Sequence, residues 1–219
     1  LIRQRTTTNS SKAGMNIDDS NNAHSQIYTL VLSAGQSLRM KQPKLLMDWG
    51  GRPVIQQVVH TLVDCGLAPV HVVTGGFSKE IEHSLAGYPV NNLFNPDYTR
   101  ADMLSSIQIG LKNAEVRVSA ALIVLGDQPQ MLPETINQVV EGYLHTRAPL
   151  VFPSYRMRRG HPWIIDRKLW DEILALPPGG TAREVVERHS SKIHYVNVYT
   201  PTILQDLDTP EDYERYRPR

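Results

Sequence analysis

The stretch that decides the fold covers residues 30–44 and reads Leu30-Val31-Leu32-Ser33-Ala34-Gly35-Gln36-Ser37-Leu38-Arg39-Met40-Lys41-Gln42-Pro43-Lys44. It starts inside an apolar run, residues 27–32, which predicts a buried strand. The run stops at small residues, which let a backbone approach a ligand closely. The cations Arg39 and Lys44 follow, and such side chains bind phosphate groups. This order of strand, small-residue turn and cations indicates a polyphosphate site.

The same stretch has an ordinary interpretation that composition alone leaves open. Only one Gly is present, so the stretch is neither G-x-x-x-x-G-K-[ST] nor G-x-G-x-x-G. A single Gly after a strand is commonly a turn, and loop cations are commonly solvated. A second observation elsewhere in the chain is therefore needed before the turn can be assigned to phosphate binding.

Length and composition narrow the class of protein. The chain has 219 residues, which is enough for one sizeable core, and a net charge of +1. We expect a disordered leader over residues 1–25, rich in Ser, Thr, Asn and Asp, and a single domain over residues 26–219. The single cysteine, Cys65, suits a reducing compartment and reads as a small core residue. These features predict a cytoplasmic protein that binds neither nucleic acid nor membrane.

Apolar runs and helical patterns alternate along most of the chain. Runs of strand type are expected at residues 27–32, 70–74, 90–94, 120–125, 150–152, 162–165, 193–198 and 203–207. Between them lie amphipathic helical patterns, the first of which starts after Pro53. This alternation predicts an α/β fold with a mainly parallel sheet that helices cover on both faces. Ligands of such sheets bind beyond the carboxyl ends of the strands, where the strand order reverses.

Carboxylates at two distant places are candidates for a metal site. Asp127 ends an apolar strand within Gly126-Asp127-Gln128-Pro129, where it is either the start of a turn or a ligand of Mg²⁺. On an extended segment, Asp206 and Asp208 point the same way and Leu207 the opposite way. Thr209 and the residues after it read as a capped helix start, so we assign Glu211 and Asp212 to that helix.

In combination these stretches resemble the MobA/MocA-like nucleotidyltransferases, which transfer a nucleotide to the molybdenum cofactor. The opening stretch is similar to their L-A-A-G-x-S-x-R-M-G-x-x-K signature, the stretch at Asp127 to their G-D-Q-P, and the end to their D-x-D-T-P-E-D. Ser33 and Lys41 depart from the opening signature, and Asp102 departs from the family's G-M-S-S-S turn. The resemblance covers about residues 27–217 and implies a Rossmann-like fold of the nucleotide-diphospho-sugar transferase (glycosyltransferase-A) type.

The resemblance also implies a set of site residues. It implies catalytic roles for Arg39 and Lys44, and Mg²⁺ binding by Asp127 and Asp208, with Asp206 second. Its acceptor-binding segment, R-x-G-x-P, implies roles for Gly160 and His161, and its G-x-x-G-A-R loop one for Arg183. The nucleotide-binding residues that it implies are Leu32, Ser33, Ala34, Gly35, Ser37, Thr74, Gly75, Ser105 and Ser106. Helix capping is the alternative for the serines, and a purely structural role is the alternative for His161.

The function that the resemblance implies is transfer of a nucleotide from an NTP to an acceptor phosphate, with release of pyrophosphate. CTP comes first and GTP second as the donor, molybdopterin is the expected acceptor, and a molybdoenzyme is the expected recipient of the product. Two alternatives stay open: a nucleotidyltransferase for a sugar phosphate or another small phosphate, and a non-catalytic carrier of nucleotide or cofactor. The sequence contains no Cys/His cluster for zinc and no G-x-S-x-G elbow for a hydrolase.

Overall fold

The structure is a computed structural model that describes residues 26–36, 40, 42–100 and 102–218. The expected leader over residues 1–25 lies outside these residues, as do Ser37, Arg39 and Lys41 of the opening stretch. None of the helices in the described part of the chain is long and apolar enough to cross a membrane.

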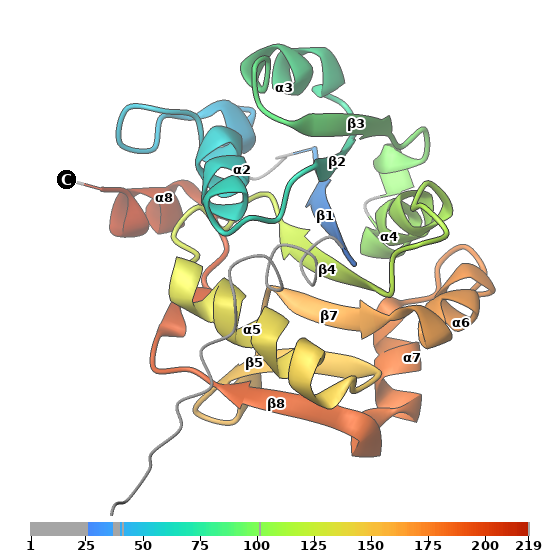
Figure 1. The fold of residues 1–219 in the computed structure, drawn as a ribbon. Coiled ribbons are helices and arrows are strands. Elements are labelled where there is room, and N and C mark those ends of the chain that lie inside the picture. Colours follow the sequence, from blue (N-terminus) through green and yellow to red (C-terminus); the bar gives the residue numbers. More distant parts are fainter. Residues whose placement is uncertain (1–25, 37–39, 41, 101, 219) are drawn as a thin grey trace, which may run out of the picture.

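A single mixed sheet forms the centre of the described chain (Figure 1). Its strands are β1 (Ile27–Ser33), β2 (Val70–Thr74), β3 (Val90–Phe94), β4 (Ala120–Leu125), β5 (Leu150–Tyr155), β6 (Arg158–Arg159), β7 (Trp163–Asp166) and β8 (Ile193–Asn197). The order is β3-β2-β1-β4-β7-β5-β6, and β8 pairs with the other edge of β5. Strands β3, β2, β1 and β4 are mutually parallel, as are β5 and β8. The expected mainly parallel α/β fold is confirmed.

Strand β7 is the antiparallel member that joins the two parallel groups. It pairs with β4 on one side and with β5 on the other. The short strand β6 returns antiparallel from β5 through a two-residue turn, in which Arg156 and Met157 both have left-handed backbone angles, φ 49° and φ 65°. This turn conformation matches the right-handed twist of a hairpin.

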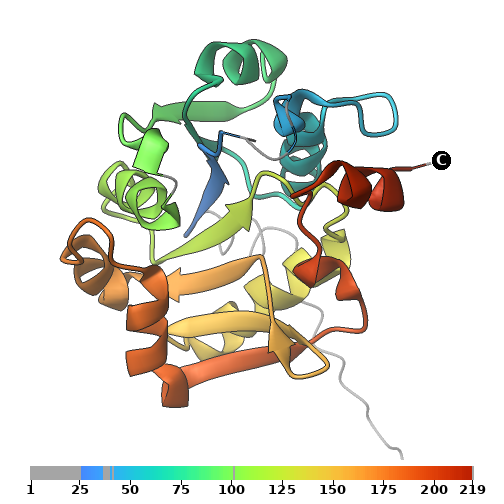
Figure 2. The same ribbon diagram turned by 180° about the vertical axis from the view of Figure 1, so that it is seen from behind.

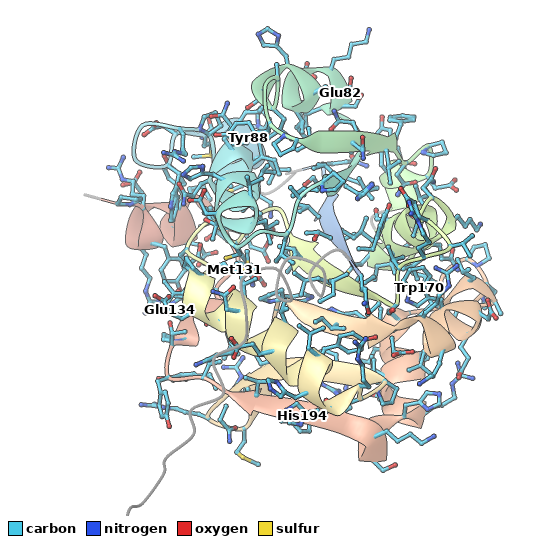
Figure 3. All side chains as sticks on the ribbon, viewed as in Figure 1. Glu82, Tyr88, Met131, Glu134, Trp170 and His194 are labelled. Carbon is cyan, nitrogen blue, oxygen red and sulfur yellow. The ribbon has the colours of Figure 1, made fainter. Side chains whose placement is uncertain are left out.

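Two apolar layers lie on opposite faces of the sheet. One face packs against α2 (Val54–Asp64) and α5 (Pro133–Thr146), and the other against α4 (Met103–Lys112), α6 (Trp170–Leu174) and α7 (Ala182–Arg188). Neighbouring residues of β1 divide between them: Val31 belongs to the first layer and Leu30 to the second. Figure 3 labels Trp170, which is buried in the second layer. Strand β1 lies inside the sheet between β2 and β4, and both of its faces are covered.

The helix ends follow the local sequence. Helix α2 carries apolar residues at helical spacing and ends before Gly66, which has φ 72°. Helix α8 (Pro210–Tyr216) starts with a capping box in which Thr209 and Asp212 satisfy each other's backbone N–H groups, as expected. Figure 2 shows α8 beside the loop before α2, where the Tyr213 hydroxyl donates to the backbone oxygen of Asp48.

One expected strand, over residues 203–207, is wrong. The segment contains a 3₁₀ helix, η6 (Pro201–Leu204), followed by extended backbone. Pro201 occupies the first position of η6, and Thr200 caps it by accepting from the N–H of Thr202 at 3.3 Å. Proline at the first position and a threonine cap favour a helical turn over a strand.

Strand β4 lies directly beside β1 in the sheet. Residues of β1 and β4 pair in parallel from Ile27 opposite Ala120 to Leu32 opposite Leu125. The chain adds β2 and β3 on one side of β1 and then crosses to place β4 on the other side. The carboxyl ends of β1 and β4 therefore flank the point where the strand order reverses, and ligands of such sheets bind there.

Candidate functional site

A cavity of about 330 Å³ lies at the carboxyl ends of β1 and β4. The loops that follow both strands line it, together with the start of α4 and the segment before α8. We call it the first pocket. Its lining residues are Leu32, Ser33, Ala34, Gly35, Lys44, Leu45, Asn95, Tyr98, Asp102, Met103, Ser106, Leu125, Asp127, Asp206 and Asp208. The opening turn, the stretch at Asp127 and the end of the chain therefore meet at one cavity.

Lys44 lies between two carboxylates in this pocket. Its Nζ donates to Asp127 Oδ2 at 2.5 Å and to Asp208 Oδ1 at 3.2 Å. Lys44 starts the short 3₁₀ helix η2 (Lys44–Leu46), and the next residue, Leu45, is buried. Burial opposes the charge of Lys44, but Asp127 and Asp208 more than offset it, so the pKa of Lys44 lies above its usual value. The ammonium group stays charged at neutral pH.

Hydrogen bonds join the loop after β4 to the segment before α8. The N–H of Leu207 donates to the backbone oxygen of Asp127 at 3.3 Å, and Gln128 Nε2 donates to Asp206 Oδ1 at 2.6 Å. Gln130 Nε2 donates to the backbone oxygen of Gln205. Leu207 is fully buried in the core, while the two flanking carboxylates line the first pocket. The extended segment thus turns its acids to one side, as expected.

The carboxylates fit a hard cation. Asp127 and Asp208 touch the same nitrogen, so the distance between them is well inside the roughly 8 Å that one hydrated Mg²⁺ can span. Within the described ranges, no group of three or more His, Cys, Asp or Glu is arranged to hold a metal ion. Two carboxylates are nevertheless enough for Mg²⁺, which keeps several waters and uses substrate phosphates as further ligands.

The start of α4 forms another part of the wall of the first pocket. Asp102 caps the helix by accepting from the N–H of Ser105 at 2.7 Å, so that N–H is already satisfied. Asn95 is fully buried, and its Nδ2 donates to the hydroxyls of both Ser105 and Ser106 at 3.0 Å. The cap of α4 is therefore Asp102, and the hydroxyls of the two serines bind the amide of Asn95 instead of capping the helix. Ser106 lines the pocket, whereas Ser105 lies beside it.

Asn95 is a pocket residue that the sequence analysis missed. It follows β3, and its side-chain oxygen accepts from the N–H of Asp97 at 2.9 Å. Its amide thus links the turn after β3 to the start of α4. The signal available in the sequence was an Asn directly before Pro, which indicates a turn and does not reveal what the side chain contacts.

Thr74 and Gly75, which were expected to bind nucleotide, lie next to the first pocket and do not line it. Thr74 ends β2 and is fully buried, so it does not line the first pocket. A Cβ at Gly75 would lie 2.5 Å from the backbone oxygen of Ala34 and 2.7 Å from Tyr98 Cβ. Only glycine fits where the loops after β1 and β2 come this close.

A second pocket of about 510 Å³ adjoins the first. The two share Met103 and Asp206 as lining residues. The second pocket carries three arginines and an aromatic pair, Phe152 and Trp163, whose rings stack with centroids 5.0 Å apart. Its lining residues are Met103, Gln128, Phe152, Arg158, Arg159, Gly160, His161, Trp163, Ala182, Arg183, Val186, Ile203, Leu204 and Asp206. All three expected acceptor-binding residues are among them.

His161 enters this pocket as a neutral side chain. Burial lowers its pKa to about 4, so the imidazole carries no charge at pH 7. Its backbone N–H donates to the oxygen of Ile203 at 3.1 Å. Gly160 lies directly under η6, where a Cβ would collide with Ile203. The positive charge for an anionic ligand must therefore come from the arginines, and His161 offers a neutral hydrogen bond.

Two expected site residues, Arg39 and Ser37, lie outside the described residues. Ser33, which departs from the family signature, is buried, and its hydroxyl has no hydrogen-bond partner among the residues that the structure describes. The hydroxyl group lies next to Gly126 at the end of β4.

Comparison with known proteins finds relatives of this chain. The sequence profile described as the MobA-like NTP transferase domain matches residues 29–193. The molybdenum cofactor cytidylyltransferase of Escherichia coli (strain K12) is 23% identical over 199 residues, which cover 88% of this chain and 98% of that protein. The bifunctional protein GlmU of Halorhodospira halophila is 30% identical over 118 residues, which cover 53% of this chain and 24% of that protein. The chain thus spans about a quarter of the length of the GlmU proteins that it matches.

Solved structures share the fold. A nucleotidyl transferase from Methanothermobacter thermautotroptrophicus superposes with a TM-score of 0.74 at 24% identity, covering 87% of this chain and 95% of that one. A protein from Mycobacterium tuberculosis, solved as a complex with manganese, has a TM-score of 0.66 at 23% identity and covers 87% of this chain and 97% of its own.

Proposed function

This chain belongs to the MobA-like NTP transferase domain family, and from that membership and the geometry of its site we propose that it transfers a nucleotide from an NTP to a phosphate-bearing acceptor and releases pyrophosphate. CTP is the first candidate donor and GTP the second, and molybdopterin is the first candidate acceptor. The observation that carries the proposal is the pair of adjoining pockets, which share Asp206 and Met103. One pocket contains Lys44 between carboxylates, and the other contains arginines.

The first pocket suits the NTP. Lys44 is a mobile cation that can turn from the carboxylates to the phosphates of a bound nucleotide. Asp127 and Asp208 would hold Mg²⁺, which neutralises phosphate charge as it develops. The small residues of the opening turn let the nucleotide lie against the backbone at the end of β1.

The second pocket suits the acceptor. Arg158, Arg159 and Arg183 offer planar donors for a phosphate group. The acceptor phosphate is already ionised, so no side chain has to act as its base. One of its oxygens forms a bond to the α-phosphorus of the NTP, the bond from that phosphorus to the bridging oxygen breaks, and pyrophosphate leaves. The chain contributes positioning and charge neutralisation.

The second candidate keeps the reaction and changes the acceptor to a sugar phosphate or another small phosphate. The arginines favour it, because a guanidinium group recognises phosphate whatever the phosphate is attached to. Molybdopterin has the additional support of the stacked Phe152 and Trp163, which line the second pocket and offer apolar surface to a ring system. Transfer of the product to a molybdoenzyme follows from the first candidate only.

The test is a pyrophosphate-release screen. Each of the four NTPs is paired with molybdopterin, glucose 1-phosphate and other sugar phosphates in the presence of Mg²⁺. Release with CTP and molybdopterin supports the first candidate, and release with a sugar phosphate supports the second. An intact protein that binds nucleotide and releases no pyrophosphate with any pair would contradict catalysis and favour a carrier.

A further inference from the structure

Asp206 occupies the wall between the two pockets. It lines both of them, and Gln128 holds it by donating Nε2 to Oδ1 at 2.6 Å. Gln128 is 1% exposed, so the amide that contacts Asp206 is buried. Lys44, in contrast, bridges the other two carboxylates, Asp127 and Asp208. Asp127 and Asp208 therefore form a pair at Lys44, and Asp206 lies at Gln128.

The charge around Asp206 is unusual for a site that binds phosphate. Of the described residues that line the second pocket, Asp206 is the acidic one, beside Arg158, Arg159 and Arg183. A carboxylate at this place repels an incoming phosphate, so it opposes the arginines if the ligand is only an anion. The repulsion is offset if the ligand also carries an N–H or O–H group, because a carboxylate is a strong acceptor for such a donor.

We propose that Asp206, positioned by Gln128, recognises a hydrogen-bond donor of the acceptor molecule close to the phosphate that receives the nucleotide. The acceptor class is then an anion that carries a hydroxyl, amine or ring N–H group near that phosphate. Asp127 and Asp208 alone hold the cation, and Asp206 is not one of its ligands. This inference rests on the proposed function and names the acceptor class of the same site.

The position of Asp206 supports this assignment, because a residue that lines both pockets is within reach of a ligand in the second one. A carboxylate has two oxygens and can accept several donors. Gln128 supplies one donor to Oδ1, and a donor on the acceptor supplies another when the second pocket is filled.

The first part of the test measures cation binding directly. Mn²⁺ is titrated into protein with bound CTP and followed by electron paramagnetic resonance, for the wild type, Asp206→Asn and Asp208→Asn. Asp206→Asn should leave the Mn²⁺ dissociation constant within about twofold of wild type, and Asp208→Asn should raise it about tenfold or more. Asp171→Asn, an exposed acid on α6, is the matched control. If Asp206→Asn weakens Mn²⁺ binding as much as Asp208→Asn does, the proposal is overturned.

The second part of the test measures the KM for the acceptor. Asp206→Asn keeps one oxygen for Gln128 and replaces the other with an NH₂ group. With the best acceptor of the pyrophosphate-release screen, this variant should raise the acceptor KM about tenfold to a hundredfold and leave the NTP KM unchanged. Gln128→Met keeps the volume, releases Asp206, and should raise the acceptor KM in the same direction. A purely structural role would lower the melting temperature and kcat without separating the two KM values.

A substrate analogue completes the test. For an acceptor that lacks the hydroxyl or amine nearest its phosphate, the KM with the wild type should rise by the same factor. With Asp206→Asn the KM should rise little further, because the same contact is already absent. Equal losses with both proteins would overturn the proposal. If the wild type releases no pyrophosphate with any pair, the proposed function and the acceptor role fail together, while the Mn²⁺ arm still decides whether Asp206 is a ligand.

Discussion

Lys44→Met tests the centre of the first pocket. The side chain of Lys44 is 13% exposed, and its two partners, Asp127 and Asp208, are 18% and 50% exposed. Methionine keeps the apolar stem and removes the charge. We expect turnover to fall by about a hundredfold or more, because one positioned cation at a developing phosphate charge commonly contributes that much.

The same change should cost less in stability than in catalysis. Removal of Lys44 leaves two carboxylates that repel each other, and a fully buried unpaired charge costs about 3–5 kcal/mol. Asp208 is half exposed and water screens it, so we expect a loss of about 1–2 kcal/mol in the free energy of unfolding. For a chain of this size, that lowers the melting temperature by roughly 2–8 °C. Added Mg²⁺ should restore part of it, because the cation takes the place of the ammonium group.

The assays are urea unfolding and pyrophosphate release, each with and without Mg²⁺. The matched control is Lys112→Met, at an exposed lysine in the last turn of α4. It should change the free energy of unfolding by no more than about 0.5 kcal/mol and leave turnover unchanged. A folded Lys44→Met protein with near-normal turnover would refute the role of Lys44. A loss of stability that Mg²⁺ does not reverse would refute the idea that cation and ammonium group share one place.

Three further predictions concern other parts of the chain. Asp127→Asn and Asp208→Asn should each raise the Mg²⁺ concentration needed for turnover, and the double change should cost much less than the sum of the two; additive losses in a double-mutant cycle would show two independent roles. His161 has a pKa lowered to about 4, so between that pH and about 6.5 the unfolded chain binds more protons than the folded chain. The contribution of neutral His161 to the free energy of unfolding is therefore complete above pH 6.5 and is lost as the pH falls towards 4. His161→Asn should remove up to about 3 kcal/mol of this dependence, and unfolding curves at pH 4.5 and pH 7.5 that keep their difference would contradict it. Tyr143→Phe removes the donor to Asp166 Oδ2 at 2.9 Å, where both residues are buried, and should cost about 1.5–3 kcal/mol by urea unfolding; a loss under about 0.5 kcal/mol would mean that another donor takes its place.

The centre of the fold could be predicted from the sequence because its signals are local. The run at residues 27–32 and the run at residues 120–125 are apolar without alternation, which is the pattern of strands buried on both faces. The helix start at Thr209 also follows from neighbouring residues, since proline and two acids come directly after a capping residue. In each case the residues that decide the structure lie within one turn or one strand.

The parts that could not be predicted depend on distant contacts. The run at residues 162–165 indicated a strand but not its direction, and only the path of the chain makes β7 antiparallel between β4 and β5. The contacts of Asn95 and Gln128 could not be predicted, because the partners of their side-chain amides lie on α4 and before α8. The closeness of Asp127 and Asp208 likewise came from a family resemblance. Hydrogen bonds between segments so far apart leave no periodic trace in the sequence.

The contacts between the loop after β4 and the segment before α8 can form only after both segments have been synthesised. Lys44 and Asp208 are 164 positions apart, so a ribosome working at about 5–20 residues per second needs roughly 10–30 s to make the second after the first. During that interval the strands of the first half can pair while Lys44 still lacks one of its two carboxylate partners. A nascent chain that ends before residue 206 lacks Asp206 and Asp208, so the proposed site is complete only after the segment before α8 has packed against the loop after β4.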